Sequence, residues 1–242
     1  WHGVESDLLH MHGVLINARN MVFNVTAEEP VWDKARPMLD RLIQDLPQAR
    51  PEPRKWLAKC QTGDEGVRIP AQVNYVGKAV DLYSLGYVFD PSSLVVTRYL
   101  RMSWLWDKIR VQGGAYGAFM SFLSYRDPNI TKTLEVYDQT ADYLIRSEFS
   151  REEVEKAIIG TIGDMDAYRL PDAKGFTAML RHLTGETDEA RQKRREAVLA
   201  TTGEDFRTFG QWLRQLAAQG HVVVLGDGSA LDQAVNSGLQ LD

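Results

Sequence analysis

The residues of this chain that could act on a carbonyl group are concentrated between Arg110 and Tyr116, in the run Arg-Val-Gln-Gly-Gly-Ala-Tyr. An arginine is always charged, the pair Gly113 and Gly114 lets a second backbone approach closely, and a tyrosine hydroxyl can donate to a developing oxyanion. This combination indicates binding of a polarised carbonyl. The same spacing also fits a tight helix-to-strand turn in which both glycines take positive φ and Tyr116 packs.

A phosphate-binding loop is a third interpretation of Gly113 and Gly114. Glycine-rich phosphate loops follow a strand and open a helix, because the helix N-terminus binds the anion. Here the pair follows a predicted helix and precedes a predicted strand, which disfavours this interpretation. If it were correct, a nucleotide would raise the melting temperature of the protein.

Other reactive side chains lack the partners that chemistry would need. His10 and His12 share a face only on a strand, whereas their leucine-rich surroundings predict a helix, and no third metal ligand is adjacent. Cys60 is the single cysteine, which excludes an internal disulfide and a cysteine-rich zinc site and fits a reducing compartment. We therefore predict no metal site in this chain and interpret Cys60 as inert.

Charge and hydropathy argue against several classes of protein. The net charge is −5 over 242 residues with both signs interspersed, which argues against a nucleic-acid or anionic-membrane partner. No apolar run approaches the ~20 residues of a membrane helix, and no signal-peptide pattern opens the chain. We expect a soluble protein of the cytoplasm or an organelle matrix. Because the chain begins with Trp1 rather than methionine, we expect a fragment or a processed product.

Periodicity and capping signals predict alternating strands and helices. The predicted strands are 20–26, 67–76, 114–119, 121–125 and 221–225. The predicted helices include 31–46, a long helix from Asp90-Pro91 with an apolar stripe, and 134–145, 150–165 and 201–220. The stripe consists of Val95, Tyr99, Met102, Trp106 and Ile109, and capping boxes are predicted at Ser150/Glu153 and Thr201/Glu204. This order predicts an α+β fold, a mainly antiparallel sheet with helices packed on one face. Residues 1–19 form a lead-in segment and 20–242 a single domain.

The predicted hairpin after Tyr116 lacks a recognisable turn. Nothing between Phe119 and Met120 looks like the tight loop, usually with Gly, Asn or Asp, that two antiparallel strands need. We hypothesise that the protein carries further residues between these two positions. The mass of the intact protein tests this, because a mass that matches the printed chain would exclude it.

Three segments of the chain resemble the last domain of presequence proteases, which belong to the pitrilysin/insulinase class of zinc metallopeptidases. The segments are Trp106–Gly117, Ser124–Asn129 with Thr133-Leu134, and Pro70–Gly77. The resemblance implies a metallopeptidase half-domain of the pitrilysin/insulinase type. It also implies a parent protein with four homologous α+β domains, forming two bowl-like halves around a closed chamber that admits short unfolded peptides.

In that family the first domain carries an inverted zinc motif, His-x-x-Glu-His with a distal Glu, and this chain has no such segment. The resemblance therefore implies the C-terminal, non-metal part of a zinc metalloendopeptidase, inactive alone, with zinc held by the N-terminal half. Arg110 and Tyr116 match the catalytic Arg and Tyr that reach the substrate, and Gly113 and Gly114 would bind substrate. The alternative is a non-catalytic structural or partner subunit of the same fold.

Overall fold

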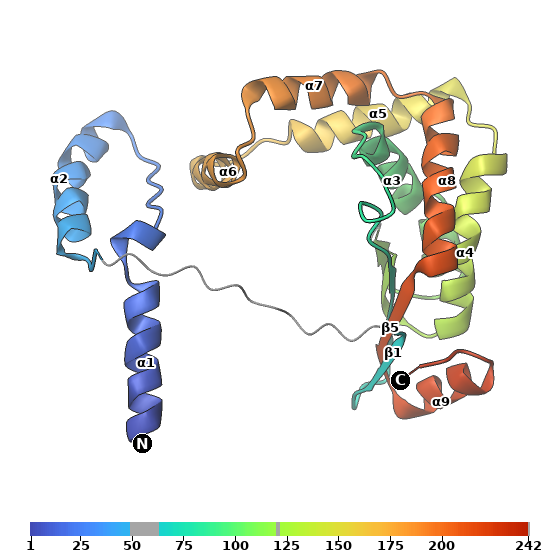
Figure 1. Cartoon of the computed structure of the whole chain (residues 1–242). Coiled ribbons are helices and arrows are strands. Elements are labelled where there is room, and N and C mark those ends of the chain that lie inside the picture. Colours follow the sequence, from blue (N-terminus) through green and yellow to red (C-terminus); the bar gives the residue numbers. More distant parts are fainter. Residues whose placement is uncertain (49–62, 120–121, 242) are drawn as a thin grey trace. The chain divides into compact units, whose positions relative to one another are not determined.

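The computed structural model describes residues 1–48, 63–119 and 122–241, which form two compact units (Figure 1). The first unit combines the described part of 1–59 with 168–187, and the second combines the described parts of 60–167 and 188–242. The division into a lead-in segment, 1–19, and a single domain, 20–242, stays a prediction. Cys60 and the junction after Phe119 lie outside the described residues or at their edge, so both hypotheses about them stay untested.

The first unit is helical. It contains α1 (His2–Leu15), the 3₁₀ turn η1 (Ala18–Asn20), α2 (Glu29–Asp45) and α6 (Pro171–Thr184). The helix predicted at 31–46 is confirmed as α2. The strand predicted at 20–26 is wrong, since residues 21–28 have no regular structure. A β-rich sequence becomes a strand only where a neighbour completes its hydrogen-bond ladder, and none of the described residues does so there.

The second unit contains a five-stranded sheet in the order β1-β5-β2-β4-β3. Its strands are β1 (Glu65–Arg68), β2 (Asn74–Ala79), β3 (Gly117–Phe119), β4 (Leu123–Asp127) and β5 (His221–Gly226). Strands β1 and β5 pair in parallel, and the other three pairings are antiparallel. The mainly antiparallel sheet, the hairpin and the strand at 221–225 are therefore confirmed, within a sheet that is mixed rather than purely antiparallel.

The strand predicted at 67–76 is split into β1 and β2. Residues 69–73 interrupt it around Pro70, which has no backbone N–H to donate to a ladder. The two pieces then flank β5 on opposite sides, β1 in parallel and β2 antiparallel. The C-terminal strand is thereby inserted between two segments that are neighbours in sequence.

One face of this sheet is covered by helices and the other is open. Along β5 buried and exposed residues alternate, with Val222, Val224 and Gly226 on the covered side. Helix α4 (Ile130–Arg146) packs over β2, and α9 (Gly228–Asn236) packs on the same face, since Leu231 lies against Gly66, the partner of Val224. The predicted arrangement of helices on one face is confirmed. The open face carries apolar and aromatic side chains, namely Val67, Tyr75, Leu123, Tyr125, Val223 and Leu225.

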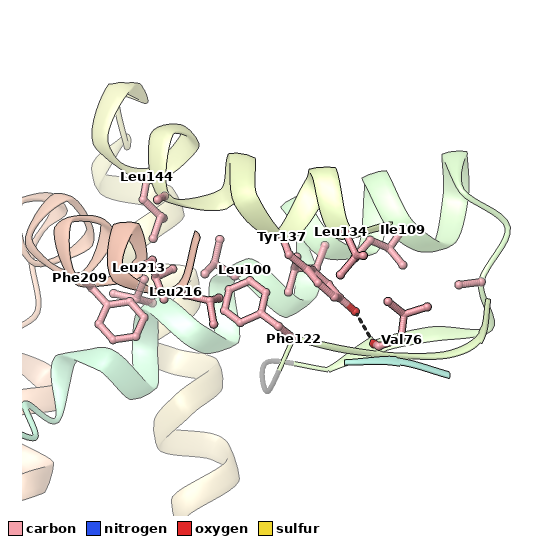
Figure 2. Packing of buried hydrophobic residues seen from close by; sticks show 14 of the residues in the cluster. Val76, Leu100, Ile109, Phe122, Leu134, Tyr137, Leu144, Phe209, Leu213 and Leu216 are labelled. Atoms are coloured by element: carbon pink, nitrogen blue, oxygen red, sulfur yellow. Dashed lines mark hydrogen bonds between the residues drawn. The ribbon is translucent and has the colours of Figure 1, made fainter. Parts of the chain in front are cut away.

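The helical layer supplies most of the core. Helices α4 and α8 (Gly203–Gln219) lie side by side, and α3 (Ser92–Met102), α5 (Arg151–Met165) and α7 (Asp188–Leu199) complete the layer (Figure 1). Buried residues of α3, α4 and α8 meet those of the sheet, and the Tyr137 hydroxyl donates to the Val76 carbonyl oxygen at 3.2 Å (Figure 2). This bond joins α4 to β2, the middle strand of the sheet.

Two local predictions in the helical layer need correction. The long helix after Pro91 ends at Met102, and a π-helix, η2 (Trp106–Gln112), follows. The stripe is interrupted where α3 ends: Val95 and Ile109 are buried, whereas Met102, the last residue of α3, and Trp106, the first residue of η2, are exposed.

The capping box at Ser150/Glu153 is confirmed. The second box is wrong by one position, because Thr202 and Asp205 form it rather than Thr201 and Glu204. Thr201 is buried instead and donates to the Ala197 carbonyl oxygen. Helix α9 was not expected from the sequence. Among the described residues, no helix is both long and apolar enough to cross a membrane.

Candidate functional site

The turn that carries the glycine pair connects η2 to β3. Gly113 ends the π-helix, and a Cβ at this position would lie 2.6 Å from the Ile109 carbonyl oxygen. Gly114 has φ +79°, a conformation that side chains disfavour. The predicted helix-to-strand turn is present, but of its details only the positive φ of Gly114 is confirmed. Gly113 has φ −85°, and Tyr116, which was expected to pack, is 60% exposed. The phosphate-loop interpretation fails, because the pair lies at the C-terminal end of a helix, where carbonyl groups rather than N–H groups point outward.

The start of α4 also holds this turn in place. The side-chain amide of Asn129, the residue before α4, donates to the Gly113 carbonyl oxygen at 2.5 Å. The backbone N–H groups of Gly114 and Ala115 donate back into η2, to Arg110 and Ile109 respectively. The chain is therefore held on both sides where it turns from η2 into β3.

The structure brings Arg110 and Tyr116 together. The Arg110 Nη1 atom donates to the Tyr116 carbonyl oxygen at 2.6 Å. The guanidinium carbon lies 5.1 Å from the centroid of the Tyr116 ring and 4.3 Å from that of the Trp106 ring. At these distances a guanidinium group is attracted to the ring faces. The Tyr116 side chain is nevertheless open to solvent, with Tyr116 60% exposed.

Tyr116 is one of three neighbouring tyrosines. Its ring centroid lies 5.8 Å from that of Tyr125 on β4, and Tyr125 lies 5.4 Å from Tyr75 on β2. These separations are those of favourable edge-on and tilted aromatic pairs. Tyr75 and Tyr125 belong to the open face of the sheet, so the row of rings runs along that face.

A β-bulge in β4 adds a second arginine to this row. In the pairing of β2 with β4, Asn74 lies opposite Asp127 and Val76 lies opposite Ser124. Two residues of β4, Tyr125 and Arg126, therefore stand opposite the single residue between Asn74 and Val76. Arg126 takes up the extra length in a left-handed conformation, with φ +53°. Such a conformation costs a non-glycine residue about 1–2 kcal/mol.

The bulge decides which side chains face outward. In a regular strand Arg126 would point to the opposite side from Tyr125. Here both are on the outer side, and the Arg126 guanidinium carbon lies 5.4 Å from the Tyr125 ring and 5.7 Å from the Tyr116 ring. In the described part of the chain, neither Arg110 nor Arg126 forms an ion pair. The site is therefore an aromatic row with two uncompensated positive charges.

The same bulge turns Asp127 inward. Asp127 is fully buried, and its carboxylate accepts from the Thr133 hydroxyl at 2.6 Å and from the Asn129 N–H at 2.8 Å. Its carbonyl oxygen accepts from the Asn74 side chain at 2.8 Å. Asp127 therefore joins the end of β4 to the start of α4. From the sequence, Arg126 and Asp127 are identified only as part of a motif. Their separate positions follow from the bulge, and a bulge cannot be recognised from the alternation of apolar and polar residues.

No metal centre accompanies the site. Over residues 1–48, 63–119 and 122–241, no three His, Cys, Asp or Glu side chains are grouped so that they could hold a metal ion. His10 and His12 lie on the exposed helix α1, His182 on α6 and His221 at the start of β5. The described residues therefore do not fit a zinc site.

The family model of the PreP C-terminal domain matches residues 64–227 of this chain. Over 247 aligned residues the chain is 40% identical to "Presequence protease 1, chloroplastic/mitochondrial" of Arabidopsis thaliana, an alignment that covers 98% of this chain and 23% of that protein. It is 29% identical to "Protein HypA" of Clostridium perfringens, over 93% of this chain and 24% of the other. The chain thus spans about a quarter of the length of these curated relatives.

Solved structures share the fold. The crystal structure of pitrilysin matches with a TM-score of 0.54 and 11% identity, over 81% of this chain and 23% of the other. The inactive domain of a peptidase M16 from Pseudomonas fluorescens gives the same TM-score and identity, over 81% of this chain and 50% of that structure. At this identity the similarity shows the fold, and the α+β arrangement described above is that fold.

Proposed function

The chain belongs to the PreP C-terminal domain family, and we propose that it is the C-terminal, non-metal-binding part of a zinc metalloendopeptidase that degrades short unfolded peptides in a closed chamber. The support is the family model, the 40% identity to a presequence protease and the fold shared with pitrilysin. As a quarter of such a protein, this part would be inactive alone and would work against the N-terminal half. Its setting would be the cytoplasm or an organelle matrix, the latter supported by the chloroplastic and mitochondrial relative.

One observation carries the proposed role of this chain in that enzyme. Arg110 and Tyr116, six residues apart, are held against each other at an exposed edge of the sheet by a 2.6 Å hydrogen bond and a ring contact. The hydrogen bond uses the backbone carbonyl of Tyr116, so the phenol hydroxyl is not consumed by it. An exposed phenol beside a fixed cation is a suitable pair for a peptide carbonyl that gains negative charge.

The two side chains would act differently on that carbonyl. Tyr116 would donate its hydroxyl proton in a hydrogen bond to the oxygen of the tetrahedral intermediate. Arg110 would bind a neighbouring substrate carbonyl and add positive potential, while its contact with Trp106 keeps the guanidinium group in place. Gly113 and Gly114, which carry no side chains, would let the peptide backbone come close to the turn.

Zinc would be supplied by the N-terminal half of the enzyme. The described residues of this chain offer no ligand group for it, so we assign none of them to the metal. In this proposal the chain contributes substrate binding and oxyanion stabilisation only. Its partners are the peptide substrate and the other half of the same enzyme.

The experiment is Tyr116→Phe in the full-length enzyme, assayed with an unfolded peptide. Loss of one oxyanion donor typically costs about a hundredfold or more in turnover, and we expect that loss here with zinc content unchanged. Tyr83→Phe is the matched control, because Tyr83 lies in the same unit and is exposed to a similar degree, 64% against 60%.

Near-normal turnover of the Tyr116→Phe enzyme would remove Tyr116 from the mechanism. If Arg110→Met were also without effect, the chain would instead be a structural or partner subunit that has kept the fold. Purified full-length protein that hydrolyses no peptide at all would refute the peptidase itself.

A further inference from the structure

The first unit has no apolar core of its own. Among its described residues, 1–48 and 168–187, the one buried residue is Asn17, and the buried apolar residues of the described chain all belong to the second unit. Helices of this length gain most of their stability from the packing of an apolar stripe. The stripes of the first unit are exposed: Leu8, Met11 and Leu15 on α1, Val31, Met38 and Leu42 on α2, and Phe176, Leu180 and Leu183 on α6. The first unit is therefore incomplete without a partner.

We propose that the first unit docks onto a β-sheet in the preceding part of the same polypeptide, and that residues 20–26 pair with strands of that sheet on both edges. The inference rests on one part of the proposed function, namely that the chain is the C-terminal quarter of a longer protein. The boundary between the preceding domain and the domain of the second unit then lies after α2, rather than after residue 19 as the sequence predicts.

The segment 20–26 has the composition of an inner strand. Its sequence, Asn-Met-Val-Phe-Asn-Val-Thr, is β-rich, yet residues 21–28 have no regular structure in the described chain. Strands at the edge of a sheet are usually protected against further pairing by charged residues or proline. The segment contains neither. It is therefore suited to pairing on both edges.

The elements around this segment repeat those around β5. The order α1, 20–26, α2 corresponds to the order α8, β5, α9. Val22-Phe23-Asn24-Val25 and Val222-Val223-Val224-Leu225 occupy corresponding places, and an acidic residue, Glu28 or Asp227, is the N-cap of the helix that follows. Strand β5 is an inner strand, paired with β1 on one edge and with β2 on the other. By this correspondence, 20–26 requires two partner strands.

These partner strands have to come from outside the described residues. The five described strands form one sheet, whose ends are β1 and β3, and a segment added to either end would pair on one edge only. The alignment with the Arabidopsis presequence protease covers 98% of this chain, so the first unit has a counterpart there. That alignment spans only 23% of the relative, and the PreP C-terminal domain model begins at residue 64, after α2. We therefore assign the partner strands to the preceding part of the same polypeptide.

Hydrogen exchange in the intact full-length enzyme tests the pairing. We expect the amides of 21–26 to exchange at least about a hundredfold more slowly than those of an unstructured peptide. Val22→Pro removes an N–H group from an inner strand and should reduce this protection at least about tenfold. Val88→Pro is the matched control, because Val88 is also an exposed valine outside regular structure but lies in the second unit. It should leave the protection of 21–26 unchanged.

Photochemical cross-linking in the same enzyme identifies the partner. With benzoylphenylalanine in place of Phe23, we expect cross-linked peptides from the polypeptide that precedes this chain. Cross-links to β1 or β3 would place the segment on an end of the second unit's sheet. Cross-links between isotopically light and heavy molecules would identify a second copy as the partner. Either of these two results overturns the inference.

Peptidase activity separates this inference from the proposed function. If the full-length enzyme hydrolyses an unfolded peptide but the amides of 21–26 exchange as fast as those of an unstructured peptide, the inference is wrong and the function stands. If these amides are protected and position 23 cross-links to the preceding part, but no peptide is hydrolysed, the inference stands and the peptidase function fails.

Discussion

Replacement of Asp127 by alanine should remove the main connection between the site and the helical layer. Asp127 is fully buried, and its two carboxylate oxygens accept from the Thr133 hydroxyl at 2.6 Å and the Asn129 N–H at 2.8 Å. Thr133 is itself buried, so its hydroxyl would be left without a partner and out of reach of water. The carboxylate also lies near the N-terminus of α4, where negative charge is favourable.

The expected loss follows from these contacts. A hydrogen bond to a charged group contributes about 1.5–3 kcal/mol to stability. A buried donor that is left without a partner destabilises the protein further, because it has lost its hydrogen bonds to water and gained none in return. Removal of the buried carboxylate also relieves the cost of burying a charge, which offsets part of this loss. We therefore expect Asp127→Ala to lower the free energy of unfolding by about 3–5 kcal/mol, a large share of the 5–15 kcal/mol typical of a protein domain.

Urea unfolding followed by circular dichroism measures this change. With a slope of about 2 kcal/mol per molar urea, the midpoint should fall by roughly 1.5–2.5 M. Asp90→Ala is the matched control, because Asp90 is exposed and its carboxylate accepts one hydrogen bond, from the N–H of Ser92 at the start of α3, at 2.8 Å. It should cost only about 1 kcal/mol.

A double-mutant cycle separates the contact from other effects of the substitution. Thr133→Val removes the hydroxyl but keeps the volume, and its effect should shrink by about 1–2 kcal/mol when Asp127 is already alanine. A loss below about 1.5 kcal/mol for Asp127→Ala, or strictly additive effects in the cycle, would refute the view that the bulge exists to bury this carboxylate.

Four other substitutions test the structure of the second unit. Tyr137→Phe should cost about 0.5–1.5 kcal/mol at neutral pH, since it deletes the bond to the Val76 carbonyl oxygen. Burial raises the pKa of the Tyr137 hydroxyl, so the folded state keeps this proton to a higher pH than the unfolded state does. The stability that the protonated hydroxyl contributes is therefore present below about pH 10 and is lost as the pH rises further. In alkaline unfolding curves, the Tyr137→Phe variant should lose stability less steeply above about pH 10 than the wild type. Gly114→Ala should lower the free energy of unfolding by about 1–2 kcal/mol through its positive φ alone, and an unchanged midpoint would contradict that conformation. Gly113→Ala should lower the free energy of unfolding further, because its Cβ would meet the Ile109 carbonyl oxygen at 2.6 Å. Gly163→Ala should instead raise the free energy of unfolding by about 0.5–1 kcal/mol, because Gly163 lies inside α5 with open space around it.

Much of the fold was accessible from local sequence signals. The apolar periodicity of α4, the capping box at Ser150/Glu153 and the β-rich run of β5 are each contained within a short segment, and the structure confirms all three. The motif Arg110 to Tyr116 was also identified locally, together with the tight turn that its glycines allow. The roles of Arg110, Tyr116, Gly113 and Gly114 remain predictions.

Predictions failed where the outcome depended on a partner strand or a change of helical pitch. Residues 20–26 have strand composition but no neighbour to pair with among the described residues. The run from Val67 to Val76 looked continuous, yet it separates into two strands because β5 lies between them. Met102 and Trp106 are exposed because they lie on either side of the break between α3 and the π-helix η2, a break that the apolar periodicity does not predict.

The sequence by itself therefore determined the order of most elements, the class of fold and the residues Arg110 to Tyr116, because these depend on periodicity and spacing within short segments. The tertiary structure alone decided that Arg126 joins this site and that Asp127 does not. A bulge shifts the alternation of every later residue in a strand, and whether it forms depends on how β4 pairs with β2. That pairing joins residues some fifty positions apart, which no local pattern encodes.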